Sequence, residues 1–271
     1  MKIEKMHGCG NDFCVLDYAE GIDYSRLAVK LCSRKTGIGS DGMIIVKQNP
    51  LEMLFYNADG SRAPMCGNGI RCFAKYCLEH QYIKRNKFDV LTGAGKMTIE
   101  ITTEQPFLCR VDMGSPVMNN AMIYVSDELD SFGRVLQVKD IRITVYSFFM
   151  GTVHTVVFVP DMESELLAYA EAICRHPLFT RQTNVNFVQV IDDKTIRVKT
   201  FERGVGWTLA CGTGCCASVV AASRLGLTGT EVRVELELGY LEIEIKKKNV
   251  YMTGPAVKVF ECELEEEMRN A

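Results

Sequence analysis

The sequence predicts an α+β protein made of two related halves. Three observations support this prediction. Short apolar or alternating runs bounded by Gly, Asn and Asp recur along the 271 residues, segments with helical spacing are few, and one cysteine–glycine motif returns half a chain later. The length and β-branched content of the short runs are typical of strands, and their number favours a mostly antiparallel sheet.

The strands are expected where these runs fall, at 13–16, 43–46, 53–56, 97–101, 109–113, 141–149, 153–159, 186–191, 196–200, 232–238, 240–245 and 257–261. Apolar residues recur at helical spacing in four segments, which are 25–32, 69–79, 163–175 and 214–225. Two of these helical segments directly follow the repeated motif.

The motif is Cys66-Gly-Asn-Gly in the first half and Cys211-Gly-Thr-Gly in the second, so its two copies stand about half a chain apart. A weaker match begins at Gly10 and Gly151, at nearly the same spacing. Two pairs at similar spacing indicate an internal repeat with a boundary near 115–120. We therefore expect halves at 1–116 and 117–256. A last strand at about 257–271 could return to the first half, which the sequence leaves open.

The composition excludes several function classes. A net charge of −3 and the lack of a long basic block argue against a nucleic-acid partner, and no apolar run approaches the roughly 18 residues that cross a bilayer. The polar N-terminal segment does not resemble a signal peptide, so we expect a cytoplasmic protein. Its twelve cysteines are then mostly buried, reduced thiols. Paired C-x2-C clusters and nucleotide-binding motifs are lacking, so neither a metal nor a cofactor is expected.

A single Cys-Gly-x-Gly motif before a helix could already bind an anion and present a reactive cysteine. Glycines leave backbone N–H groups uncovered, and these groups lie at the positive end of a helix, which attracts anions. A substrate carboxylate could dock there, and a cysteine in the same field should have a pKa below its usual value. One copy could equally be a turn with a structural cysteine. Two copies at half-chain spacing favour a functional pair.

A two-fold arrangement of the halves would bring both helix starts to one substrate, with a sulfur on either side of the carbon next to its carboxylate. One sulfur, as thiolate, could remove the α-proton, and the other, as thiol, could return a proton to the opposite face. Oriented N–H donors would stabilise the charge that develops on the carboxylate. The pattern therefore predicts a cofactor-independent amino-acid racemase or epimerase with Cys66 and Cys211 as its acid and base.

Several motifs resemble those of the diaminopimelate epimerase family. They are His7-Gly-Cys-Gly-Asn-Asp-Phe13, Gly37-Ile-Gly-Ser-Asp-Gly42, Asn57-Ala-Asp-Gly-Ser61, Cys66-Gly-Asn-Gly-Ile-Arg-Cys72, Glu202-Arg-Gly-Val-Gly206, Ala210-Cys-Gly-Thr-Gly214 and Thr253-Gly-Pro-Ala256. The matches extend over nearly the whole chain, and their order and combination are specific for the family.

The resemblance implies two pseudo-symmetric halves, each a mostly antiparallel sheet curled around a central helix, in an enzyme that closes on its substrate and is often a homodimer. It implies Cys66 and Cys211 as the catalytic pair. It also implies that the carboxylate at the reacting carbon is held by backbone N–H groups of Gly67, Asn68, Gly212 and Thr213. The residues that would line the site and recognise the far end of the substrate are Asn11, Asn57, Asn184, Glu202 and Arg203. Adjacent Glu202 and Arg203 suit a zwitterionic amino-acid end.

The chain departs from the family pattern in its specificity residues. The family usually has Gly-Asn-Pro-His where this chain has Gly151-Thr152-Val153-His154, so Thr152 replaces an amide that contacts substrate. Trp207, the only tryptophan, could pack on the surface or shape the pocket. His154 could tune a cysteine or orient a carboxylate, or be a satisfied strand histidine.

We expect conversion of LL- to meso-diaminopimelate, a step in lysine and peptidoglycan precursor synthesis. Because Thr152 alters the site, a racemase for another amino acid, such as histidine or lysine, is the main alternative. A relative that binds an amino acid without turnover is a remote one. A thiol redox protein would be expected to carry a C-x-x-C motif, which the sequence lacks.

Overall fold

The computed structural model describes residues 1–118, 123 and 132–265. The chain forms two compact units, the first of Met1–Val111 with Gly254–Ala271 and the second of Asp112–Thr253. Residues 119 and 120, at the end of the expected boundary segment, and 266–271, at the end of the expected last strand, lie outside the described residues.

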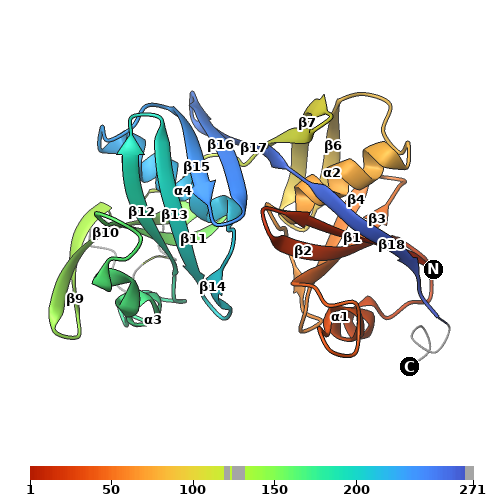
Figure 1. Cartoon of the computed structure of the whole chain (residues 1–271), viewed down its shortest axis with the longest axis horizontal. Helices are drawn as coiled ribbons and strands as arrows, with labels where there is room; N and C mark the ends of the chain where they lie inside the picture. Colours follow the sequence, from red (N-terminus) through yellow and green to blue (C-terminus); the bar gives the residue numbers. More distant parts are fainter. Residues whose placement is uncertain (119–122, 124–131, 266–271) are drawn as a thin grey trace. The chain divides into compact units, whose positions relative to one another are not determined.

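The first unit is a mixed sheet with two helices (Figure 1). In chain order its elements are β1 Lys2–Gly8, β2 Asn11–Asp17, α1 Tyr24–Cys32, β3 Gly42–Lys47, β4 Glu52–Asn57, β5 Arg62–Ala63, α2 Gly69–Glu79, β6 Lys87–Thr92, β7 Gly95–Glu104, β8 Phe107–Asp112 and β18 Val257–Glu263. Strands β2 and β3 run parallel, as do β4 and β6, and the other pairs along the sheet are antiparallel.

Helix α2 is the centre of the first unit. It packs against β1, β2, β3, β4 and β18, so one sheet covers it on several sides. Eight of its eleven residues are buried, among them Ile70, Phe73 and Cys77. The three residues that are not fully buried, Lys75, Leu78 and Glu79, lie three and four positions apart and so share one face of the helix. The shorter α1 packs on the outside, against β2, β3 and β4.

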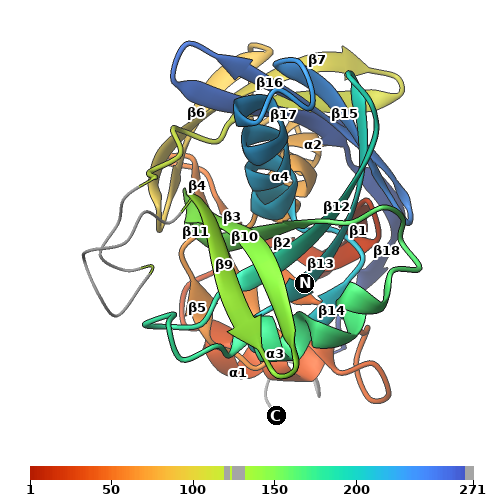
Figure 2. The same ribbon diagram turned by 90° about the vertical axis from the view of Figure 1, so that its left-hand side faces the viewer.

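The second unit has the same construction. Its elements are β9 Phe132–Val138, β10 Ile141–Met150, β11 Thr152–Phe158, the 3-10 turn η1 Glu165–Tyr169, α3 Ala170–Cys174, β12 Asn184–Asp192, β13 Thr195–Glu202, β14 Gly206–Thr208, α4 Gly212–Arg224, β15 Glu231–Leu236, β16 Gly239–Lys246 and β17 Asn249–Pro255, whose last two residues belong to the first unit. Helix α4 packs against β10, β11, β12, β13, β15 and β16. Figure 2 shows α4 among the strands of its own sheet.

The strand pairings of the two units match one for one. In the first, β1 to β4 pair in the order antiparallel, parallel, antiparallel, and β10 to β13 in the second pair in the same order. The first pair of the parallel register is Phe13 with Gly42 in the first unit and His154 with Asn184 in the second. Phe13 of β2 and His154 of β11 therefore occupy equivalent positions. The repeat inferred from two short motifs therefore extends through the whole sheet.

The expected α+β class with two pseudo-symmetric halves is confirmed. All expected strands and helices fall on observed elements, but β1, β5, β6, β9, β14 and β17 were not predicted. The expected helix at 163–175 is a 3-10 turn followed by one helical turn. No helix among the described residues is long and apolar enough to cross a membrane.

Candidate active site

In the first unit, Cys66 lies just before α2, and its sulfur accepts a hydrogen bond from the helix start. The N–H of Gly69 donates to Cys66 Sγ over 3.3 Å. A Cβ at Gly69 would stand 3.2 Å from the Cys66 Cβ, so the missing side chain lets the loop turn tightly around the sulfur. The N–H groups of a helix start carry partial positive charge, so the half-buried thiol sits where a negative charge is favoured.

Two of the expected substrate residues gather at this sulfur. Asn11 Oδ1 lies 3.8 Å from Cys66 Sγ and accepts a hydrogen bond from Asn68 Nδ2 over 3.0 Å. Asn11 opens β2, directly after a two-residue hairpin turn in which Cys9 and Gly10 both have positive φ. A two-residue turn of this kind matches the natural twist of the paired strands. The hairpin thereby sets where Asn11 enters the sheet.

Asn57 and Gly67 make contacts within their own loops. Asn57, at the end of β4, donates from Nδ2 to Ser61 Oγ over 2.9 Å. The carbonyl oxygen of Gly67 accepts from Arg71 Nη1 over 3.0 Å.

Arg71 is a site-supporting residue that the sequence analysis did not single out. It lies in α2 and has no exposed surface, yet it carries a charge. Its Nε donates to the carbonyl oxygen of Pro255 over 3.0 Å, and Nη2 lies 3.8 Å from Cys9 Sγ. Arg71 thus ties the Cys66 loop to the hairpin and to the end of β17. The sequence feature that could have indicated this role is an arginine between apolar residues at the start of an expected helix. A charge in such a place is buried only when its donors are satisfied, so it is expected to bind backbone or side-chain acceptors.

In the second unit, Cys211 is the N-cap residue of α4, the position that Asn68 holds in α2. It has extended backbone angles directly before Gly212, and its carbonyl oxygen accepts the helical hydrogen bond from Cys215 N over 2.9 Å. Its sulfur lies 3.6 Å from Thr213 Oγ1. Cys211 is only 6% exposed, whereas Cys66 is half-buried.

The expectation of a lowered thiol pKa is wrong for Cys211. Burial raises its pKa well above the ordinary value, and the negative charge of Glu202 raises it further. Hydrogen bonds from Thr213 and from the N–H of Gly214 act in the opposite direction but do not prevail. The helix start stabilises the thiolate, but removing the thiolate from water costs more free energy than this stabilisation returns, so the pKa of Cys211 rises.

A chain of buried hydrogen bonds leads to this second sulfur. Asn186 Nδ2 lies 3.2 Å from His154 Nδ1, and His154 Nε2 lies 3.0 Å from Thr213 Oγ1. Asn186 Oδ1 accepts from Thr200, and its Nδ2 also donates to the carbonyl oxygen of Thr155, so this amide orientation is fixed. Burial of the imidazole, with the nearby Arg203 charge, lowers the pKa of His154 to about 3.

His154 is therefore a neutral imidazole that accepts at Nδ1 and donates from Nε2. Thr213 Oγ1 accepts this hydrogen bond, and its own O–H is directed at Cys211 Sγ. Both options for His154 in the sequence analysis thus meet in one residue, because it is a fully satisfied strand histidine and is also linked to the cysteine.

The remaining expected residues of the second unit gather at the end of β13. Arg203 donates from Nη2 to Thr152 Oγ1 over 2.9 Å, and its backbone N–H donates to Asn184 Oδ1 over 3.0 Å. Glu202 Oε1 accepts from Thr208 Oγ1 over 2.7 Å. Glu202 and Arg203 thus contact different side chains of one cluster.

The sequence profile of the family described as "Diaminopimelate epimerase" matches residues 3–119 and 146–259. Diaminopimelate epimerase of Caldanaerobacter subterraneus subsp. tengcongensis is 41% identical over 280 residues, which covers 98% of this chain and 100% of the relative. That of Desulfitobacterium hafniense is 44% identical over 273 residues, 96% of each chain. The chain belongs to the diaminopimelate epimerase family. It is accordingly an isomerase of the racemase and epimerase class.

Solved structures agree with the family fold. A PhzF-family phenazine biosynthesis protein of Bacillus anthracis superposes with a TM-score of 0.73 at 15% identity, covering 98% of this chain and 99% of that one. A hydroxyproline epimerase of Agrobacterium vitis with bound trans-4-hydroxy-L-proline gives 0.69 at 12% identity, covering 97% and 91%. At such identities the likeness concerns the fold alone.

Trp207 is the second departure from the family pattern. Its ring packs against Phe187 and Phe201, with centroids 5.8 and 5.5 Å away, and 49% of its surface is exposed. It also lines a cavity of about 250 Å³. The other lining residues are Leu167, Lys199, Thr208, Leu209 and Glu237, and none of them is an expected substrate residue. Trp207 therefore packs on the surface and shapes a small hollow beside the Glu202 cluster.

Proposed function

We propose that this protein converts LL-diaminopimelate to its meso form by a two-thiol mechanism with Cys66 and Cys211 as base and acid. One observation carries the proposal. Each of two like-built units has a cysteine at the start of its central helix, with a backbone N–H of that helix directed at the sulfur, from Gly69 in one and Gly214 in the other. A structural thiol would have no reason to occupy this position twice.

In the proposed reaction, one cysteine acts as thiolate and takes the α-proton. An S–H bond forms, the C–H bond breaks, and the electron pair left on carbon spreads into the carboxylate. The other cysteine, as thiol, gives its proton to the opposite face of the carbon and becomes a thiolate. The configuration is inverted and the total charge is unchanged, so no cofactor is consumed. The return reaction exchanges the two roles.

The α-hydrogen of an amino acid is a very weak acid, so the enzyme must stabilise the carbanion. We assign this role to backbone N–H groups of Gly67, Asn68, Gly212 and Thr213. Helix starts suit this task because their donors are fixed before the charge develops and need no reorganisation.

We assign recognition of the far end of the substrate to Asn11, Asn57, Thr152, Asn184, Glu202 and Arg203. A guanidinium can bind a carboxylate through two parallel hydrogen bonds, and a carboxylate can accept from an ammonium group. These are the groups that the second amino-acid end of diaminopimelate presents. The product would serve lysine and peptidoglycan precursor synthesis, and we expect the enzyme to work in the cytoplasm as a homodimer.

The decisive experiment follows α-proton exchange of diaminopimelate in deuterated water. The wild-type protein should incorporate deuterium and interconvert the isomers. Cys66→Ala and Cys211→Ala should each abolish interconversion. Cys262→Ala, which removes a partly exposed thiol of β18, is the matched control and should retain activity. Retained interconversion after either active-site substitution would refute the two-thiol mechanism.

Thr152 supports a second candidate, a racemase for another amino acid such as histidine or lysine. Its hydroxyl already accepts from Arg203, so it offers less to a substrate than an asparagine amide would. The same exchange assay with those amino acids separates the two candidates. Exchange of histidine or lysine without exchange of diaminopimelate would decide for the alternative, and no exchange of any amino acid would indicate a binding protein.

A further inference from the structure

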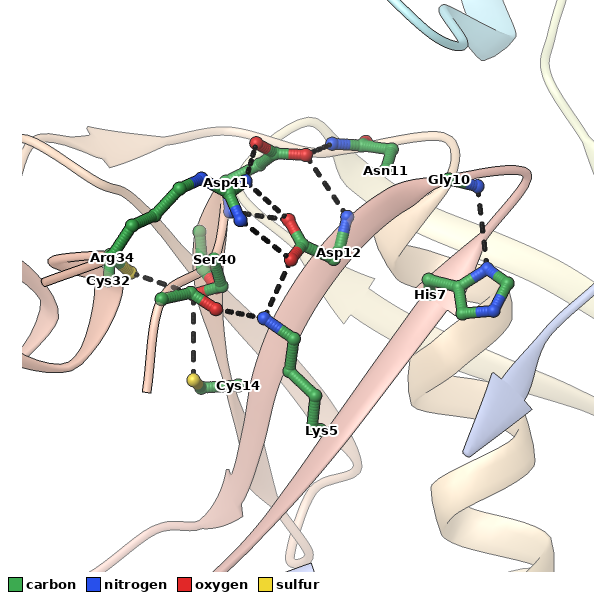
Figure 3. Close-up of polar contacts among 12 residues, drawn as sticks. Lys5, His7, Gly10, Asn11, Asp12, Cys14, Cys32, Arg34, Ser40 and Asp41 are labelled. Carbon is green, nitrogen blue, oxygen red and sulfur yellow. Dashed lines mark hydrogen bonds and ion pairs between the residues drawn. The ribbon is translucent and has the colours of Figure 1, made fainter. Parts of the chain in front are cut away.

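In the first unit, the carboxylate of Asp41 contacts the amide nitrogen of Asn11, whereas Cys66 lies near the amide oxygen. Its Oδ2 accepts from Asn11 Nδ2 over 2.6 Å and from the backbone N–H of Asp12 over 3.1 Å. Its Oδ1 accepts from Arg34 Nη2 over 2.8 Å. Figure 3 shows Asp41 between the guanidinium of Arg34 and the amide of Asn11.

Asp41 is itself held in position. Its backbone N–H donates to both the carbonyl oxygen and Oδ1 of Asp12. Arg34 contacts both carboxylates, and Lys5, which is almost fully buried, forms an ion pair with Asp12 over 2.6 Å. Because two cations neutralise two carboxylates, the acidic pair is stable beside the site.

This contact fixes which way round the Asn11 amide lies. A carboxylate only accepts hydrogen bonds, so the amide atom that faces Asp41 must be the nitrogen. The oxygen then faces the opposite way, where Asn68 Nδ2 donates to it and Cys66 Sγ lies 3.8 Å away. Cys66 therefore meets an acceptor, which suits a thiol that donates its proton. With the amide turned over, the sulfur would meet N–H donors, which suit a thiolate.

We propose that Asp41 is a positioning residue that fixes the Asn11 amide and thereby holds Cys66 as a thiol with its proton directed at Asn11. The inference rests on the proposed function only for the catalytic meaning of that proton. The second unit lacks this device, because Thr152 and Thr183 occupy the positions that correspond to Asn11 and Asp41.

The test measures how fast Cys66 is alkylated by iodoacetamide at pH 7, with mass spectrometry of the peptide that carries it. Asp41→Ala removes the acceptor, so Asn11 can present its nitrogen to the sulfur. We expect Cys66 to react two- to tenfold faster, since the thiolate is the nucleophile. Asp41→Asn keeps an oxygen at the Oδ2 position and should react like wild type. Asp41→Ser is too short to reach Asn11, should react like Asp41→Ala, and serves if the alanine variant fails to fold.

The controls separate positioning from general destabilisation. Asp89→Ala removes another acidic side chain of the first unit, one that is paired with Lys96, and should leave the rate unchanged. In the background of Asn11→Ala, Asp41→Ala should have no further effect, because its action runs through Asn11. Three outcomes would each overturn the proposal. Asp41→Ala and Asp41→Ser could both react at the wild-type rate, or Asp41→Asn could react as fast as they do. Asp41→Ala could also raise the rate in the Asn11→Ala background as much as it does in the wild type. Alkylation needs no turnover, so an inactive wild-type protein would refute the proposed function and leave this result standing.

Discussion

His154 Nε2 donates to Thr213 Oγ1 over 3.0 Å, and this contact orients the hydroxyl that faces the buried Cys211 sulfur. The imidazole can donate there only because its Nδ1 is occupied by the amide nitrogen of Asn186. The hydroxyl proton of Thr213 is thus directed at Cys211 by a chain of three side chains that begins at Asn186. The chain helps the thiolate form where burial opposes it.

Loss of the donor at His154 should therefore slow the reaction. His154→Leu leaves Thr213 without its donor, and the hydroxyl is then free to turn away from Cys211. A lost hydrogen bond to a charged group costs about 1.5–3 kcal/mol, which corresponds to a roughly 10- to 150-fold fall in kcat. His154→Gln, which can place an amide donor near the Nε2 position, should retain more activity. The double variant with Thr213→Val tests whether His154 acts through Thr213. If His154→Leu lowered kcat by the same factor in the Thr213→Val background as in the wild type, the two residues would act independently and the prediction would be wrong.

The buried imidazole should also make stability depend on pH. Its pKa of about 3 lies below the value of 6.5 for an exposed histidine, so below pH 6.5 the unfolded chain binds a proton that the folded chain does not. Stability is lost as the pH falls from 6.5 toward 3. At pH 5 the loss should be about 2 kcal/mol relative to pH 7. Urea unfolding at both pH values measures it, and His154→Gln should lack that share of the difference.

Gly214 is required because α4 passes very close to Asn186. A Cβ at position 214 would lie 2.3 Å from Asn186 Oδ1, which is buried and bound to Thr200. Gly214→Ala should cost about 2 kcal/mol of stability and displace the amide that orients His154, so kcat should fall as well. Gly229→Ala is the matched control, because its Cβ would meet only one atom, 3.7 Å away. Equal melting temperatures for the two variants would contradict the proposed crowding.

Much of the fold was predictable because it follows from local patterns. The two motifs indicated a repeat at half-chain spacing, and the sheet register reproduces that spacing at Phe13 and Phe55, which match His154 and Thr200. Strand β1 was missed because its charged residues conceal its burial. Glu4 is 3% exposed and accepts over 3.3 Å from Lys258, a partner near the other end of the chain.

The family resemblance named Asn11, Cys66 and Asn68 as site residues, and the structure brings these three side chains together. Their roles stay predictions, and the electrostatics of the two cysteines could not be read from the sequence. It could not show that desolvation exceeds the helix field at Cys211, since burial depends on residues from several strands. The Asp41 carboxylate behind Asn11 was equally hidden, because a contact between two positions in separate motifs leaves no pattern in the sequence.

Thr152 offers the sharpest test of substrate choice. Thr152→Asn restores the amide usual in the family at the position where the hydroxyl now accepts from Arg203. An amide can accept from Arg203 and still donate to a substrate, so kcat/KM for diaminopimelate should rise three- to tenfold, about 1 kcal/mol of added binding in the transition state. Thr144→Asn, on an exposed position of β10, makes the same exchange away from the cluster and should change nothing. Two results together would contradict a specificity for diaminopimelate. They are an unchanged kcat/KM for diaminopimelate in Thr152→Asn and faster turnover of another amino acid by the wild type. The site would then be adapted to a substrate that does not use that amide.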